Sequence, residues 1–278
     1  MKTCDLHTHS NFSDGACSPK ELLILAKEAG LSAIALTDHN TIDGVEDFLK
    51  ASENFDIEAI AGVEISTDYN GIELHILALC IDKKYFDVVN DFLKIPIIRK
   101  EESNKLLAEK LVKKGYEIDY EKLKANNKGS LNRVHFAREL IEKGYIDSVK
   151  EGFDTILSEN YGLYVPPKRY TVQEVIQFIS SINAVSVLAH PLLNLSKQEL
   201  IDFLEKAKNY GLMAIETRYS KYNKEEQEFS IQMASEFELL ESGGSDFHGE
   251  NKPDIKIGIG EGNLIVPYEF IKMIKEGV

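Results

Sequence analysis

The chain has 278 residues, of which 43% are hydrophobic and 28% charged, a composition typical of a globular α/β domain or a barrel with a modest insertion. A formal net charge of −14 argues against broad electrostatic binding to duplex DNA, because that binding requires a basic face. No apolar run of about 18 residues marks a membrane span, and polar residues replace the apolar part of a signal peptide, so we expect a cytoplasmic protein that does not contact membranes.

The first forty residues predict a strand, a helix and a second strand. Residues 3–9 suit a short strand, and residues 18–21 (SPKE) form a capping box with proline at the first helical position. The helix predicted over 21–29 ends at Gly30, and residues 33–37 are a short apolar run of the buried-strand type. This segment is therefore expected to be a βαβ unit.

The alternation of strands and helices recurs along the chain. Helices are predicted over 46–54, 171–182, 197–210 and 224–237, and strands over 57–65, 73–81, 184–189, 213–217 and 239–240. About seven strands that alternate with helices predict a parallel sheet that closes, or nearly closes, into a barrel.

One long stretch breaks this alternation. Residues 86–159 have an almost wholly helical pattern, with helices expected over 99–114, 133–143 and 148–158. We therefore expect a barrel domain made of residues 1–94 and 166–278, with residues 95–165 forming a helical insertion between two of its strands.

Polar side chains recur at the ends of the predicted strands. They are His7 and His9 at the first strand, Asp38 and His39 after the second, Glu64 at the third, His75 in the fourth, His190 after the strand that follows the insertion, and Asp246 and His248 after the last. Because a parallel barrel forms its site at the carboxyl ends of its strands, we expect these side chains to converge.

The spacing of these residues predicts a metal site. Alternate strand residues share a face, so His7 and His9 are expected to point together into the barrel mouth, as are Asp246 and His248 if the chain is extended there. Imidazole nitrogen and carboxylate oxygen are ligands of zinc, manganese and iron. So many titratable groups in one pocket would carry unpaired charge without cations, which predicts a multinuclear centre.

The motifs DLHTHSNFSDG, LTDHNTIDG, GVEIS with ELHIL, LAHP and GGSDFHG occur in the order seen in the PHP family, the polymerase and histidinol phosphatase superfamily of metal-dependent phosphoesterases. The chain resembles that family over nearly its whole length. It is most similar to the branch of nucleoside 3′,5′-bisphosphate phosphatases and 5′-to-3′ exonucleases acting on short RNA, because NRVHFA at 132–137 and YVPPK at 164–168 also fit that branch. The resemblance implies an α/β fold, a distorted (β/α)7 TIM-like barrel with an all-helical insertion that contributes to substrate binding.

The resemblance also implies three divalent metal ions, with Mn²⁺ favoured and Fe²⁺ or Zn²⁺ also suitable. The first would be bound by His7, His9, Glu64 and Asp246, the second by Glu64, His75 and His190, and the third by Asp14, His39 and His248. Asp38 would hold a ligand imidazole in its tautomer, and Asp38, His190 and Asp246 are expected to act closest to the reaction. Adjacent cations would supply hydroxide from water for in-line attack on phosphorus, so no side-chain nucleophile is expected.

Positive groups are expected to bind the phosphates of a nucleotide or short RNA substrate. The candidates are Arg133 and His135 in the insertion, Lys168 and Arg169 after it, and Arg218 after the strand 213–217. Val134 stands where the family often has proline after the arginine.

Two other functions remain open at this point. The same metal motifs are compatible with a histidinol-phosphate phosphatase, and a non-catalytic metal-binding module is a further alternative, although no ligand position has been lost. A plain amidohydrolase would carry a metal-bridging lysine at a strand end, and no lysine stands at such a position in the predicted strands. The sequence leaves the metal, the exact substrate, the leaving-group acid and the oligomeric state open.

Overall fold

The computed structural model describes residues 2–126 and 131–277. The chain forms two compact units, one made of residues 1–90 with 170–278 and the other of residues 91–169. The sequence-based boundaries of the insertion, 95 and 165, fall four residues inside the second unit at each end. We describe the two units separately.

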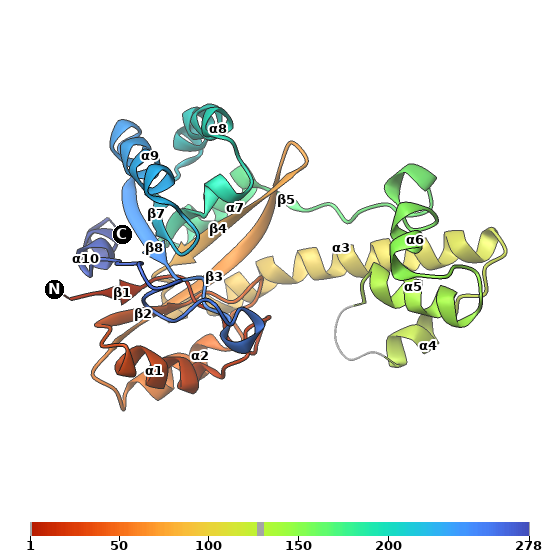
Figure 1. Cartoon of the computed structure of the whole chain (residues 1–278), viewed down its shortest axis with the longest axis horizontal. Coiled ribbons are helices and arrows are strands. Elements are labelled where there is room, and N and C mark those ends of the chain that lie inside the picture. Colours follow the sequence, from red (N-terminus) through yellow and green to blue (C-terminus); the bar gives the residue numbers. More distant parts are fainter. Residues whose placement is uncertain (1, 127–130, 278) are drawn as a thin grey trace. The chain divides into compact units, whose positions relative to one another are not determined.

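The first unit is built on a nearly closed, barrel-shaped sheet (Figure 1), as the resemblance implies. Its seven strands, in spatial order, are β1 (Cys4–Asp5), β2 (Ala33–Leu36), β3 (Glu58–Tyr69), β4 (Ile72–Leu79), β6 (Val185–Ala189), β7 (Ala214–Tyr219) and β8 (Leu240–Gly244). The short strand β5 (Tyr170–Thr171) pairs with β3 outside this order. Backbone hydrogen bonds from the N–H of Leu6 to the carbonyl of Gly243, at 3.1 Å, and from the N–H of Asp246 to the carbonyl of His7, at 2.8 Å, join the chain at the ends of the first and last strands.

The expectation of a wholly parallel sheet is wrong for β4. This strand runs antiparallel to both β3 and β6, because β3 and β4 are joined by a tight turn at Asn70 and Gly71. Both turn residues have positive φ, 54° and 86°, which is the conformation of a two-residue hairpin turn. The remaining neighbouring strands of the barrel pair in parallel.

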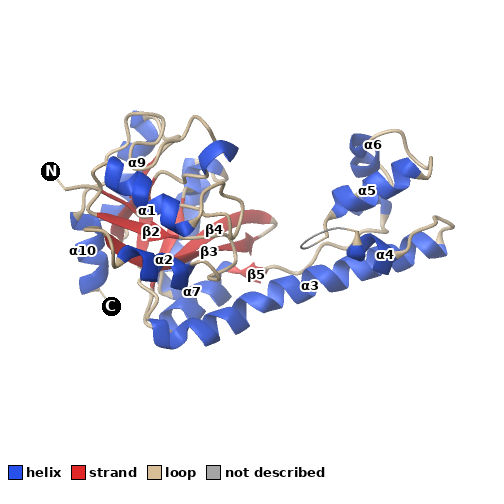
Figure 2. Cartoon of the chain, turned by 90° about the horizontal axis from the view of Figure 1, so that it is seen from below, coloured by secondary structure: helices blue, strands red, loops and turns tan. Residues whose placement is uncertain are grey.

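Helices lie around the outside of the barrel, and one of them packs against the apolar core inside it. They are α1 (Pro19–Glu28), α2 (Val45–Ser52), α7 (Val172–Ser181), α8 (Lys197–Tyr210), α9 (Lys224–Glu236) and α10 (Glu269–Glu276), with 3-10 turns at Lys83–Tyr85, Pro191–Leu193 and Gly249–Asn251. Figure 2 shows α1 and α2 beside each other along the sheet, and α9 packs on β7 and β8. Helix α10 was not predicted; its residues Phe270, Ile271 and Ile274 join the apolar core inside the barrel.

The second unit is all-helical among its described residues and has its own core. Helix α3 (Phe86–Lys113) enters this unit from the barrel, and α4 (Tyr120–Ala125), α5 (Arg133–Glu142), α6 (Val149–Asp154) and a 3-10 turn (Glu159–Tyr161) follow. Leu111, Phe136, Leu140 and Leu157 are fully buried in its core. In the described parts of the chain, no helix combines the length and apolar character needed to cross a membrane.

Candidate metal centre

The segment after β1 supplies two buried histidines. His7 and His9 lie beside the segment after β8, which pairs with them through a bridge between Thr8 and Phe247. Both imidazoles are fully buried, and their ring centroids lie 5.1 Å apart. Gly244 allows this approach, because a Cβ there would lie 2.4 Å from the backbone nitrogen of His7.

Glu64, in β3, is the carboxylate around which the histidines gather. Nε2 of His7, Nε2 of His9 and Nδ1 of His39 lie 3.2, 3.3 and 3.0 Å from its Oε2, and Nδ1 of His75 and Nε2 of His190 lie 2.8 and 3.0 Å from its Oε1. Burial alone would raise the pKa of Glu64, but the neighbouring imidazoles, led by His7, hold that pKa well below its usual range. Glu64 does not end its strand as expected, since β3 continues to Tyr69.

His75 reaches Glu64 because of the reversed direction of β4. In the sheet register, His75 lies opposite Ser66 of β3 and opposite Ala189, the residue before His190. The position expected for His75, near the carboxyl end of a parallel strand, is therefore wrong, since it occupies the first half of an antiparallel one. Burial lowers the pKa of His75, but contact with Glu64 outweighs it and raises that pKa to about 9.

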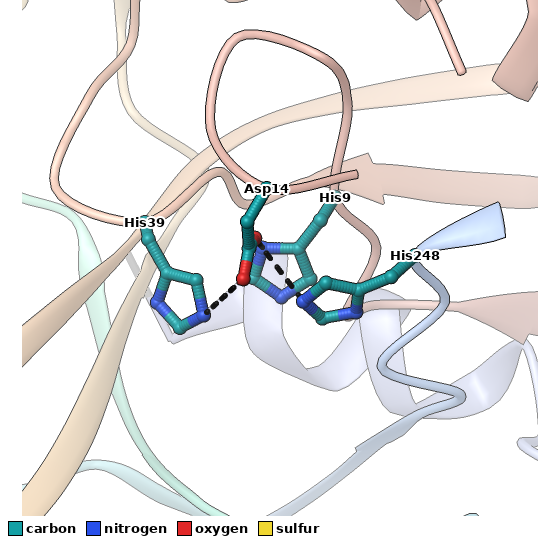
Figure 3. A group of neighbouring side chains, drawn as sticks. All are labelled: His9, Asp14, His39 and His248. Carbon is teal, nitrogen blue, oxygen red and sulfur yellow. Dashed lines mark ion pairs between the residues drawn. The ribbon is translucent and has the colours of Figure 1, made fainter. Parts of the chain in front are cut away.

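Asp14 is a carboxylate, 56% exposed at its side chain, that faces three imidazoles (Figure 3). The loop between β1 and α1 carries it, and its oxygens lie 3.2 Å from Nε2 of His248 and 3.8 Å from both Nδ1 of His9 and Nε2 of His39. Partial burial raises the pKa of Asp14, but these imidazoles, His248 first, lower it overall.

Asp246 and His190 hold backbone conformations that are uncommon for residues with a side chain. Their φ angles are +57° and +29°. The chain is therefore not extended at Asp246, which corrects the expected geometry of the pair Asp246 and His248. Oδ1 of Asp246 still lies 3.2 Å from Nε2 of His9 and 3.3 Å from Nδ1 of His248. Backbone strain of this kind costs about 1–3 kcal/mol and is concentrated at functional sites.

The cluster contains buried polar atoms that lack a hydrogen-bond partner. Among the described residues these include Nε2 of His7, both ring nitrogens of His9, Oε2 of Glu64 and Nε2 of His248. Leaving a buried polar atom unpaired costs about 1–3 kcal/mol, so natural sites seldom do so without a ligand. Imidazole nitrogen and carboxylate oxygen are the ligands of Mn²⁺, Fe²⁺ and Zn²⁺. The residues present therefore fit a group of divalent cations.

The structure brings all nine expected ligand residues into this cluster. Their ligand atoms lie within 4.8 Å of one another in four groups: His9, Asp14, His39 and His248; His7, His9 and Asp246; His7, Glu64 and His190; and His39, Glu64 and His75. These groups overlap with the three sets that the resemblance implies but do not reproduce them. In particular, His9 also joins the group around Asp14. The number of cations and their distribution stay predictions.

Glu216 of β7 belongs to the site although the motifs did not reveal it. It is fully buried. Its Oε1 lies 2.9 Å from Nδ1 of His7, and its Oε2 accepts a hydrogen bond of 2.7 Å from the backbone N–H of His190. A carboxylate that holds the outer nitrogen of an imidazole fixes the ring's tautomer and orientation. The sequence signal that could have identified Glu216 is the presence of an acidic residue inside a predicted strand.

Asp38 does not hold an imidazole, contrary to expectation. Its carboxylate accepts hydrogen bonds from the backbone N–H and hydroxyl of Ser10, at 2.7 and 2.5 Å, and from the hydroxyl of Ser13 at 2.6 Å. Asp38 therefore fixes the loop that carries Asp14. Burial is the main cause that raises the pKa of Asp38.

The candidate phosphate-binding residues fall in both units. Arg133, His135, Lys168 and Arg169 belong to the helical unit, and Arg218 belongs to the barrel unit. Arg133 lines a pocket of about 230 Å³, and Lys168 and Arg169 are exposed.

Two of these candidates have structural roles that were not expected. Nδ1 of His135 accepts a hydrogen bond of 3.0 Å from the backbone N–H of Asn132, so the ring caps helix α5 and has only Nε2 left for a ligand. Arg218 pairs with Glu241 at 3.3 Å and lies over the ring of Phe270. Its guanidinium is already paired with a carboxylate, and its role as a phosphate contact stays a prediction.

Known proteins resemble this chain along most of its length. A 5′-3′ exoribonuclease of Haemophilus influenzae is 32% identical over 248 residues, covering 89% of this chain and 90% of that protein. A 3′,5′-nucleoside bisphosphate phosphatase of Chromobacterium violaceum is 27% identical, covering 92% of this chain and 91% of that protein.

The fold has a counterpart among solved structures. A Bifidobacterium adolescentis protein assigned as a metal-dependent phosphoesterase superimposes with a TM-score of 0.71 at 26% identity, covering 99% of this chain and 96% of that one. Residues 5–166 match the model of the PHP domain, which confirms the resemblance given by the sequence motifs. The chain therefore belongs to the PHP domain family and is a metal-dependent phosphoesterase.

Proposed function

We propose that this phosphoesterase hydrolyses a phosphomonoester or a terminal phosphodiester of small nucleotides, either 3′,5′-bisphosphorylated nucleosides or short 5′-phosphorylated RNA. The observation that carries the proposal is the cluster of six histidines around Glu64, Asp14 and Asp246, with buried ligand atoms left unpaired. The relatives named above, an exoribonuclease and a bisphosphate phosphatase, support the substrate class.

The proposed centre binds three divalent cations, with Mn²⁺ favoured and Fe²⁺ or Zn²⁺ as alternatives. Its ligands are His7, His9, Asp14, His39, Glu64, His75, His190, Asp246 and His248. Cations bound there supply hydroxide from water near neutral pH and offset the negative charge of the phosphate oxygens. Glu216 orients His7, and Asp38 holds the loop of Asp14.

The pocket of the helical unit supports an anionic ligand. Arg133 donates a hydrogen bond of 3.2 Å to the carbonyl of Leu157, and its guanidinium carbon lies 4.8 and 4.2 Å from the ring centroids of Phe153 and Tyr164. Lys100 lines the same pocket, and burial lowers its pKa. No carboxylate among the described residues pairs with either cation. Since the guanidinium already covers both rings, we propose that the pocket binds a phosphate of the substrate, not a base.

The substrate proposal is tested by a panel of phosphate esters. Protein loaded with Mn²⁺, Fe²⁺ or Zn²⁺ in turn is assayed with 3′,5′-bisphosphorylated nucleosides, short 5′-phosphorylated RNAs, histidinol phosphate and sugar phosphates. We expect turnover of the nucleotide substrates, and we expect His9→Ala to abolish it while the fold is kept. Failure to hydrolyse any nucleotide substrate contradicts the proposal, and a preference for histidinol phosphate would favour that alternative.

The pocket is tested with Arg133→Met, which keeps a long side chain but removes the charge. We expect KM for the nucleotide substrate to rise about 10- to 100-fold, the equivalent of the roughly 1.5–3 kcal/mol of a charged hydrogen bond, with unchanged Mn²⁺ binding. Arg138→Met, an exposed position on the same helix, is the matched control. An unchanged KM in Arg133→Met would remove the pocket from the substrate site.

A further inference from the structure

Two donors from different segments meet on one oxygen of Asp246. The hydroxyl of Tyr219, the last residue of β7, donates a hydrogen bond of 2.9 Å to Oδ2, and Nζ of Lys252 donates another of 2.9 Å to the same atom. The other oxygen, Oδ1, faces the imidazoles of His9 and His248. The two oxygens of this carboxylate are therefore in different surroundings.

We propose that Tyr219 and Lys252 are positioning residues that hold Asp246 so that only Oδ1 is offered to a cation. A carboxylate can bind a metal through one oxygen or both, and rotation about its side chain exchanges the two oxygens. Two hydrogen bonds to Oδ2 oppose that rotation. Asp246 also has a strained backbone, with φ at +57°. This inference rests on the proposed metal centre but does not depend on which substrate the enzyme uses.

The two donors differ in character, which makes the proposal testable. Tyr219 is 3% exposed and neutral, and its ring lies 5.2 Å from that of His190 and 5.3 Å from that of Tyr222. The Lys252 side chain is 34% exposed and carries a positive charge. If the charge of Lys252 acted mainly by repelling cations, its removal would strengthen metal binding, whereas loss of a positioning bond weakens it.

The test measures Mn²⁺ binding to metal-free protein by titration calorimetry, together with electron paramagnetic resonance of the bound Mn²⁺. The variants are Tyr219→Phe, which removes only the hydroxyl, Lys252→Met, which removes the donor and its charge, and Lys252→Arg, which keeps both. We expect the first two to lower Mn²⁺ affinity at one site about 10- to 100-fold, the range seen for outer partners of metal ligands, and Lys252→Arg to restore most of it.

Lys272→Met is the matched control, because Lys272 is exposed on α10 and pairs only with Glu269 among the described residues. Unchanged Mn²⁺ affinity in Tyr219→Phe, or tighter binding in Lys252→Met, overturns the inference. Should Tyr219→Phe fail to fold, the more exposed Lys252 carries the test alone. The expected losses of Mn²⁺ affinity in the variants, together with no nucleotide turnover by the parent protein, would support this inference and contradict the proposed substrate, so the two failures are distinguishable.

Discussion

Glu216 is a buried carboxylate that contacts two segments of the proposed metal centre at once. One oxygen faces the imidazole of His7, and the other accepts from the backbone of His190. Each contact requires an acceptor oxygen on Glu216. The backbone of His190 offers an N–H, and Nδ1 of His7 must carry the ring proton when its Nε2 binds a metal. The orientation of one proposed ligand, His7, and the strained turn at another, His190, thus depend on a single side chain.

The change Glu216→Gln leaves one acceptor oxygen where two are needed. We expect Mn²⁺ affinity to fall about 10- to 100-fold and the free energy of unfolding to fall by about 1–3 kcal/mol. Titration calorimetry and denaturant unfolding measure the two effects. Glu236→Gln, at an exposed position of α9, is the control. Wild-type Mn²⁺ affinity in Glu216→Gln would show that Glu216 has no part in the centre.

The hairpin of β3 and β4 is the element that departs most from an alternating parallel barrel. Its turn uses Asn70 and Gly71, both with positive φ, and the reversal carries His75 toward Glu64. Nothing lies within 4 Å of a Cβ added at Gly71, so only the backbone conformation disfavours a side chain there.

Gly71→Ala is therefore expected to destabilise the protein by about 1–2 kcal/mol, the cost of left-handed backbone for an L-residue. The matched change Asn70→Gly removes the side chain from a residue with φ at +54°, and it should leave the stability of the protein unchanged or slightly higher. Thermal and denaturant unfolding compare the two variants with the parent. Equal stability of Gly71→Ala and the parent would mean that the turn adapts to the side chain.

Much of the fold was predictable from local patterns, and the exceptions have physical reasons. The capping box at Ser18 and Glu21 forms as expected, because its partners are close in sequence. The direction of β4 was expected wrongly, although Asn70-Gly71 is a strong local hairpin signal that could have indicated it. Helix α10 was missed although Phe270, Ile271 and Ile274 stand at helical spacing, and only its position in the barrel core depends on strands distant in the chain. Likewise, motifs pointed to the nine residues that gather in the cluster, whereas Glu216 joins it only because the fold places β7 beside His7 and His190.

At the scale of the whole molecule, the chain divides into two units with separate apolar cores. Leu157 is fully buried in the core of the helical unit, and Leu6 is fully buried in the barrel core. All nine proposed metal ligands lie in the barrel unit, and Arg133 and Lys100 lie in the helical one. Metal binding and phosphate binding are therefore expected to respond to different mutations.

Leu157→Ala should destabilise the helical unit by about 2–5 kcal/mol through the cavity it leaves. We expect KM for the nucleotide substrate to rise while Mn²⁺ binding keeps its parent affinity. Leu6→Ala, the matched change in the barrel, should weaken Mn²⁺ binding. Calorimetric Mn²⁺ titration and steady-state kinetics check both variants. Loss of Mn²⁺ affinity in Leu157→Ala equal to that in Leu6→Ala would show that the units are not independent.

The backbone pairing between the first strand and the segment after β8 also determines when the centre can assemble during synthesis. His7 and His9 leave the ribosome before Asp246 and His248, which complete their surroundings and follow some 240 residues later. The helical unit between them has its own apolar core, and none of the residues of that core comes from either end of the chain. A nascent chain therefore carries seven of the nine proposed ligands before Asp246 and His248 are made, so the proposed centre cannot be complete before that point.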